Sequence, residues 1–121
     1  MDDSIKFMGF SSDALLHIRT ASAFVMSSKF EGLSNSMLES LCMGVPTICT
    51  KCGGGGAEAV IRNGVNGILV DIDDDIAESE ALNKIVEDKS YSNHLSNNAL
   101  MLRQSLSLET IGNEWANLLF K

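Results

Sequence analysis

Two glutamates, Glu31 and Glu39, flank a run of small and polar residues at 32–36, with seven residues between them. An apolar helix is expected to follow at about residues 35–42. The first amides of a helix lack intrahelical acceptors, and the helix dipole favours negative charge there. A carboxylate one turn inside the helix can accept hydrogen bonds from two vicinal hydroxyls, such as those of a ribose. The pattern therefore suggests a nucleotide-sugar site, with Glu39 on the ribose and Glu31 towards the sugar.

The same residues also fit a purely structural pattern. Ser36 and Glu39 have the spacing of a capping box, in which the glutamate bonds back to the amide that begins the helix. From spacing alone, this explanation is the commoner one. The two interpretations differ in geometry, because the capping box requires a helix that starts at Ser36 and a Glu39 turned towards its own backbone. Glu31, taken alone, fits a solvated loop carboxylate.

Four consecutive glycines, Gly53 to Gly56, form the second feature with chemical potential. The run is not a P-loop, because no Lys-Ser or Lys-Thr pair follows it. Such a run permits either close approach of the backbone to a ligand or a flexible connection, and the sequence leaves both open. Glu58, just after the glycines, fits a favourable first-turn helix charge better than a catalytic role.

Metal or redox chemistry is not expected from this chain. Cys49 and Cys52 form an isolated Cys-x-x-C pattern, and zinc would need two further ligands. The remaining candidates, Cys42, His17 and His94, do not have the spacing of a metal motif. We therefore expect no metal site and no cofactor.

Composition limits the class of protein. The 121 residues allow one domain, and 45% hydrophobic with 21% charged residues is typical of a folded globular chain. The net charge of −7, with scattered basic residues, argues against nucleic acid as a partner. No apolar run is long enough to span a bilayer, and the acidic start of the chain does not resemble a signal peptide. Together with an odd number of cysteines, these features favour the cytoplasm.

Apolar runs and turn signals predict the elements that position these residues. Short strands are expected at 5–10, 22–26, 47–50 and 68–70, with helices after the first three of them. Three further helices should close the chain, and the last, at 108–119, has the clearest apolar stripe, with Trp115 at a core position. This alternation indicates an α/β fold: a partial Rossmann-like domain of about four parallel strands with helices on both faces and a helical C-terminus.

In such folds the ligand lies beyond the carboxyl ends of the strands. Three loops are expected there, at residues 9–12, 27–36 and 50–56. Their convergence would place both glutamates and the glycine run at one edge of the sheet.

Several motifs in order resemble the C-terminal part of retaining glycosyltransferases of family 4 (group 1), which have the two-domain B-type fold. The resemblance covers about residues 5–119. The matching residues are Ser27, Phe30-Glu31-Gly32-Leu33, Asn35, Leu38-Glu39, Met43-Gly44-Val45-Pro46-Thr47-Ile48, the glycine run, Glu58, Ile61, Asn63-Gly64, Asn66-Gly67 and Leu69-Val70.

The resemblance implies roles for these residues in binding a nucleoside diphosphate sugar. Glu39 would hold the ribose, and Glu31 would touch the sugar as the catalytic residue. The diphosphate and the sugar would meet the loop that begins the helix. The base would lie near the turn at residues 8–10. The implied donor-binding residues are Gly9, Gly32, Leu33, Ser34, Asn35, Ser36 and Glu39. No metal is implied, and the reaction would transfer a sugar to a glycan or lipid with retention, in polysaccharide assembly.

The chain also departs from the family. The acceptor-binding N-terminal domain and a basic pair that clamps the diphosphate have no counterpart, so residues 1–121 are expected to form one partial nucleotide-sugar-binding domain. We expect this fragment to be inactive alone, to need the missing N-terminal part, and to self-associate through an open sheet edge. The parent enzyme is expected in the cytoplasm, at the inner membrane face. A non-catalytic nucleotide-sugar-binding module and part of a sugar-nucleotide epimerase remain alternatives.

Overall fold

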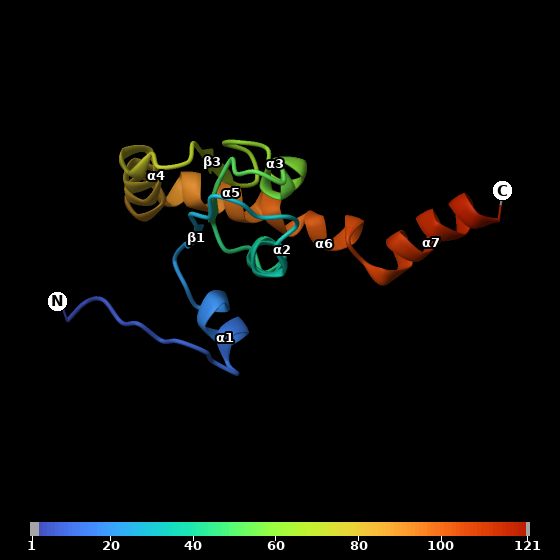
Figure 1. The fold of residues 1–121 in the computed structure, drawn as a ribbon, viewed down its shortest axis with the longest axis horizontal. Coiled ribbons are helices and arrows are strands. Elements are labelled where there is room, and N and C mark those ends of the chain that lie inside the picture. The colour runs from blue at the N-terminus through green and yellow to red at the C-terminus, as the bar shows by residue number, and fades with distance from the viewer. Residues whose placement is uncertain (1–2, 121) are drawn as a thin grey trace.

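The computed structural model describes residues 3–120 (Figure 1), in which helices and strands alternate before a helical C-terminal region. The elements in chain order are α1 (Ala14–Arg19), β1 (Phe24–Met26), α2 (Asn35–Cys42), β2 (Thr47–Thr50), α3 (Gly56–Val60), β3 (Ile68–Val70), α4 (Asp75–Glu87), α5 (Lys89–Leu100), α6 (Leu102–Ser105) and α7 (Leu108–Leu119).

The strands form one parallel sheet in the order β1-β2-β3. Phe24 lies opposite Thr47, and Ile48 lies opposite Ile68, which fixes the register of both pairs. Every residue of β2 is buried, because strands lie on both sides of it and helices cover both faces. A continuous apolar run is typical of such a strand, and the parallel α/β architecture expected from the sequence is confirmed.

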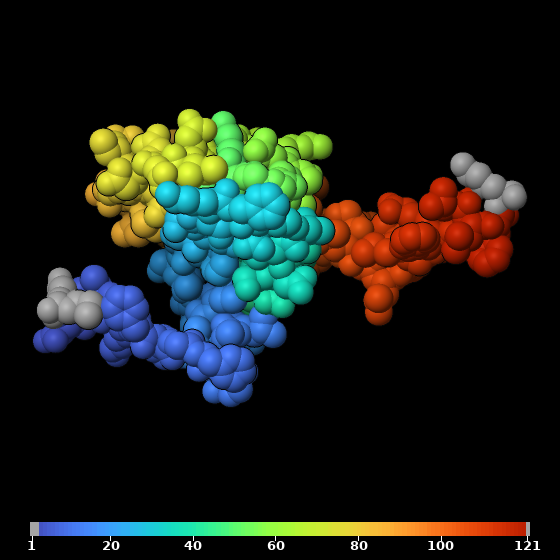
Figure 2. Space-filling model, in the orientation of Figure 1, coloured from blue at the N-terminus to red at the C-terminus, as the bar shows by residue number. Residues whose placement is uncertain are grey.

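The expected number of about four strands is wrong, because residues 5–10 form no strand. They are irregular and exposed, with Phe10 98% accessible to solvent. A strand needs a neighbour to take its backbone hydrogen bonds. Among the described residues β1 pairs only with β2, so residues 5–10 make no backbone pairing with the other edge of β1. In Figures 1 and 2 this blue segment extends away from the body of the molecule.

Two apolar clusters cover the two faces of the sheet. On one face Cys49 packs with Met37 and Leu41 of α2 and with residues of α3. On the other face Ile48 packs with Ile85 of α4 and with further apolar residues of β3 and α5. Neighbouring residues of β2 point to opposite faces, as the pleat requires. Helices therefore lie on both faces, as the sequence predicts.

Helix α2 is fixed at its C-terminal end by side chains from far along the chain. Ser96 Oγ donates to the Gly44 carbonyl at 2.6 Å, and Arg103 Nε donates to the Cys42 carbonyl. Gly44 has a φ of 71°, which favours glycine, and an added Cβ would lie 2.9 Å from Leu100 Cγ. These contacts hold α2 at a set height over the sheet.

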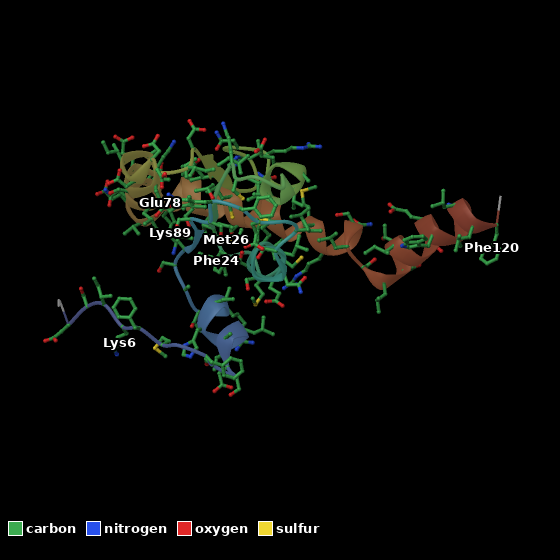
Figure 3. All side chains as sticks on the ribbon, viewed as in Figure 1. Lys6, Phe24, Met26, Glu78, Lys89 and Phe120 are labelled. Carbon is green, nitrogen blue, oxygen red and sulfur yellow. The ribbon has the colours of Figure 1, made fainter. Side chains whose placement is uncertain are left out.

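Helix α7 lies outside the packed body, although its apolar stripe is the clearest in the chain. No residue of α7 is buried. The predicted core position of Trp115 is wrong, because its side chain is 58% exposed. Figure 3 shows the contrast: Phe24 and Met26 lie within the body, and Phe120 lies at the far end of the projecting helix.

Candidate functional site

The candidate site is built on the start of α2. The helix begins at Asn35, as predicted, and Ser34 is its N-cap with an extended backbone. Ser34 Oγ accepts a hydrogen bond from the Met37 amide at 3.3 Å. A capping box of Ser36 and Glu39 is therefore not formed, and the structural explanation of Glu39 is wrong. Ser34 could have been proposed as the cap from the sequence, because serine is a favoured N-cap residue. The sequence offers Ser36 equally, and it does not distinguish between the two.

Backbone amides without acceptors lead into this helix. Within the described part of the chain, hydrogen bonds reach the amides on either side, at Glu31 and Met37, but none is made by the five between them. These are the amides of Gly32, Leu33, Ser34, Asn35 and Ser36. Such a row of free donors at a positive helix end is suited to an oxyanion, and a phosphate group needs no cationic side chain to bind there.

The two glutamates differ in their surroundings. Glu39 is exposed on α2, one turn beyond these amides, and its carboxylate makes no hydrogen bond within residues 3–120. Glu31 is half-buried in the loop, and Ser28 Oγ lies 3.5 Å from its Oε2 atom, which is a weak contact. Both carboxylates are therefore available to a ligand, with Glu39 beside the helix and Glu31 at the start of the loop.

The glycine run lies directly against the loop that carries Glu31. Phe30 and Gly53 form a parallel bridge, and the Glu31 amide donates to the Gly53 carbonyl at 2.9 Å. Thr50 Oγ1 donates to the Ser28 carbonyl at 2.5 Å. The expected loops at 27–36 and 50–56 thus converge at the carboxyl ends of β1 and β2.

The third expected loop does not join them. Gly9 lies in the exposed segment before α1, and its φ of 61° allows a turn that favours glycine. In Figure 1 this segment runs away from the start of α2. The structure therefore brings six of the predicted donor-binding residues together with Glu31, and the seventh, Gly9, stands apart.

Two lysines lie at the same edge of the sheet, each paired with an aspartate that follows β3. Lys29 Nζ is 3.1 Å from Asp73, and Lys51 Nζ is 3.9 Å from Asp71. Exposed pairs of this kind contribute little to stability. Sequence reasoning missed them, although Lys51 directly follows an expected strand end and Lys29 lies three residues after another. Both lysines are part of the loops expected at residues 27–36 and 50–56, so they bring positive charge to the site.

The cysteines do not form a reactive site. Burial, and secondly the charge of neighbouring Cys52, raises the pKa of the Cys49 thiol to about 12, so it stays protonated at neutral pH. Among the described residues no group of three or more His, Cys, Asp or Glu side chains is placed to hold a metal ion.

A cavity of about 630 Å³ lies elsewhere, between α3 and the α5–α6 region. Glu58, Arg62 and Asn98 are among its lining residues, and neither Glu31 nor Glu39 is. The candidate site is instead an open surface at the sheet edge. Its unpaired amides, rather than the size of a hollow, distinguish it.

Residues 1–101 match the family model for "Glycosyl transferases group 1". The chain belongs to this family. The two-domain B-type resemblance noted in the sequence is thereby confirmed at the level of family and fold.

Curated relatives named as glycosyltransferases agree with this assignment. The chain is 35% identical over 92 residues to the lipopolysaccharide core biosynthesis glycosyltransferase LpsE of Rhizobium meliloti, covering 76% of this chain and 26% of that protein. It is 27% identical over 126 residues to an α-1,4-N-acetyl-D-galactosaminyltransferase of Campylobacter jejuni that is named for an undecaprenol-linked glycan. The match covers 98% of this chain and 35% of that protein. The chain thus spans about a quarter to a third of the length of these relatives.

Solved structures of two other proteins share the fold. Anabaena HepE in complex with UDP superposes with a TM-score of 0.85 at 25% identity, over 94% of this chain and 31% of HepE. The C-terminal domain of a group 1 protein, LpcC from Francisella tularensis, superposes with a TM-score of 0.72 at 22% identity, over 84% of this chain and 51% of that one.

None of the helices described for residues 3–120 has the length and apolar character needed to cross a membrane.

Proposed function

We propose that this chain forms the donor-binding part of a glycosyltransferase that moves a sugar from a nucleoside diphosphate sugar to a glycan or lipid, with retention of configuration. One observation carries the proposal. Five unpaired amides lead into α2 beside Glu39, a carboxylate that its own helix does not use.

Each part of the site has a chemical role in this proposal. The amides of residues 32–36 bind the diphosphate and the sugar. Negative charge grows on the diphosphate as it departs, and fixed donors at the positive end of a helix stabilise that charge. Glu39 accepts hydrogen bonds from the ribose hydroxyls, and Glu31 contacts the sugar near the reacting carbon. Amides and basic side chains take the place of a metal ion.

The whole enzyme needs more than residues 1–121, which we assign to one partial nucleotide-sugar-binding domain. An acceptor-binding N-terminal part and a basic pair for the diphosphate are expected from it. Residues 1–121 alone would bind the donor and not the acceptor, so we expect them to be inactive by themselves. The relatives are named for lipopolysaccharide core and undecaprenol-linked substrates. These names support a role in surface polysaccharide assembly. The location that we propose for the parent enzyme is the cytoplasm, at the inner face of the membrane.

The central test is a calorimetric titration of the chain with UDP and with GDP, comparing Glu39→Ala with the unchanged protein. UDP is the first probe because HepE was solved with it. Removing a charged acceptor from two ribose hydroxyls should weaken binding by about tenfold or more. Glu114→Ala, on projecting α7, is the matched control and should leave the affinity unchanged.

Two results would contradict the proposal. One is equal affinity of Glu39→Ala and the unchanged chain for the nucleotide that binds. The other is no binding of either nucleotide at millimolar concentration. Glu31→Gln should keep nucleotide binding and remove sugar transfer in the full-length enzyme, which separates a transferase from a passive binding module.

Self-association of the fragment belongs to the same proposal. The outer edge of β1 is unpaired among the described residues, and an open parallel edge invites another strand. Sedimentation velocity should therefore show association that grows with protein concentration. A monomer at every concentration would contradict this part.

A further inference from the structure

The close packing of the glycine run against the catalytic loop is the starting point. A Cβ added at Gly54 would lie 2.3 Å from the Glu31 carbonyl oxygen. One added at Gly56 would lie 1.8 Å from the Gly32 carbonyl oxygen and 2.8 Å from the Leu33 amide nitrogen. These neighbours are backbone atoms, so no side chain can rotate away to relieve the contact. Glycine is required here by the neighbouring backbone.

Hydrogen bonds fix the two segments in register. The Gly53 amide donates to the Lys29 carbonyl at 3.3 Å, and the Gly53 carbonyl accepts from the Glu31 amide at 2.9 Å. Cys52 Sγ lies 3.9 Å from the Glu31 carbonyl oxygen, in a weak hydrogen bond. The backbone of residues 31–33 therefore rests directly on the backbone at Gly54 and Gly56, and the Cys52 and Phe30 side chains make the neighbouring contacts.

Glu39 is held in a different way. It lies on α2, whose position is set by Met37 and Leu41 against the sheet and by Ser96 at the far end of the helix. The Glu31 loop depends on the glycine run, and the Glu39 helix depends on the core. The glycine backbone therefore contacts the Glu31 loop directly, and it reaches α2 through Ala57, which packs in the same cluster as Met37 and Leu41.

We propose that Gly54 and Gly56 are positioning residues that set the height of the Glu31–Gly32–Leu33 backbone. They control contact with the transferred sugar and leave the nucleotide end of the donor to α2. This inference rests on the proposed function for its ligand. Its backbone part can be measured without any ligand.

The chain offers a graded set of alanine substitutions. Gly56→Ala meets backbone atoms, whereas a Cβ at Gly53 would lie 2.7 Å from Cδ2 of Phe30, an exposed ring that can move. Gly112, within α7, has open space around it and serves as the control. Alanine is also the better helix former at Gly56 and Gly112 alike, so intrinsic propensity does not account for a difference between them.

The first measurement uses the free chain. Backbone amide NMR shifts should change in Gly56→Ala at Glu31, Gly32 and Leu33, and should stay within a few hundredths of a ppm of the unchanged chain at Met37–Leu41. Gly112→Ala should leave all of these amides unchanged. Shifts spread equally through α2, or absent from the loop, would overturn the inference. Should Gly56→Ala unfold the chain, Gly54→Ala gives the same test at the Glu31 carbonyl, and Gly53→Ala, which meets only the Phe30 ring, should change the loop amides less.

The second measurement compares two ligands. In Gly56→Ala the affinity for UDP-glucose should fall by about tenfold or more beyond any fall in the affinity for UDP. A displacement of about 1 Å in the loop is enough to lose its contacts with the sugar. Equal losses for both ligands would overturn the sugar-specific role, since general destabilisation weakens both alike. If the unchanged chain binds neither ligand, the donor-site assignment and the sugar-specific role fail together, and the NMR result still decides whether the glycines position the loop.

Discussion

Helices α2 and α7 begin in the same way and end in different surroundings. Each is capped by a serine whose Oγ accepts from the amide three residues on, at 3.3 Å for Ser34 and 3.2 Å for Ser107. Helix α7 has the cleaner apolar stripe. Yet α2 buries Met37 and Leu41 completely, and α7 buries none of its residues.

The difference shows that an apolar stripe predicts a helix and its packing face, but not whether that face is buried. Its period identifies a helix and the face that would pack, because that face follows from local geometry. The partner depends on the path of the chain. Helix α2 connects β1 to β2 and must cross the sheet, whereas α7 follows α6 and leaves it. The helix with the weaker stripe therefore supports the candidate site.

The largest expected difference between the two helices is in the free energy of unfolding after a leucine in each is replaced by alanine. Leu41→Ala removes a fully buried side chain from the cluster under α2 and should lower the free energy of unfolding by about 2–5 kcal/mol. Leu118→Ala changes an exposed side chain on α7 and should stay within about 0.5 kcal/mol. Urea denaturation followed by circular dichroism measures both. Equal losses would mean that α7 is packed in solution.

Alkaline pH should weaken the core beneath α2. Burial raises the pKa of the Cys49 thiol from 9.0 to about 12, so the folded state holds this proton more tightly than the unfolded chain. Its contribution is complete below about pH 9 and is lost as the pH rises towards 12. The urea midpoint should fall over this range, and Cys49→Ser should flatten the fall. Burial also raises the pKa of Tyr91, so this residue should contribute to the same fall. Tyr91→Phe measures the tyrosine's share of it separately. An unchanged slope in Cys49→Ser would refute the assignment.

The two caps should show the smallest contrast. Ser34→Ala should lower the global free energy of unfolding by about 1 kcal/mol, because α2 unfolds with the core. Ser107→Ala should leave the global value unchanged and speed amide hydrogen exchange within α7 alone, since an unpacked helix opens by itself. Equal global effects of the two substitutions would show that α7 belongs to the cooperative unit.

Local patterns in the sequence were sufficient for much of the fold. The bounds of α2, β2 and β3 follow from apolar runs ended by Gly44 with Pro46, by the glycines and by Asp71. The irregular state of residues 5–10 could not be predicted, because strand formation depends on a neighbour that their own residues do not encode.

The candidate site was predicted in the same uneven way. Residues 31–39 predict the start of a helix, but Ser34 and Ser36 are both suitable N-cap residues. The structure shows that Ser34 is the N-cap. The glycine run permitted a ligand contact or a loose connection, and the structure shows a third use, direct contact with the Glu31 loop. That contact joins segments about twenty residues apart, which no local pattern reports.

Arg103 and Ser96 donate to carbonyls at the end of α2 and just after it, and they lie 61 and 52 residues beyond these acceptors. A chain growing on the ribosome therefore makes the start of α2 long before it makes the side chains that fix the opposite end. Until Arg103 emerges, this helix lacks part of its anchorage.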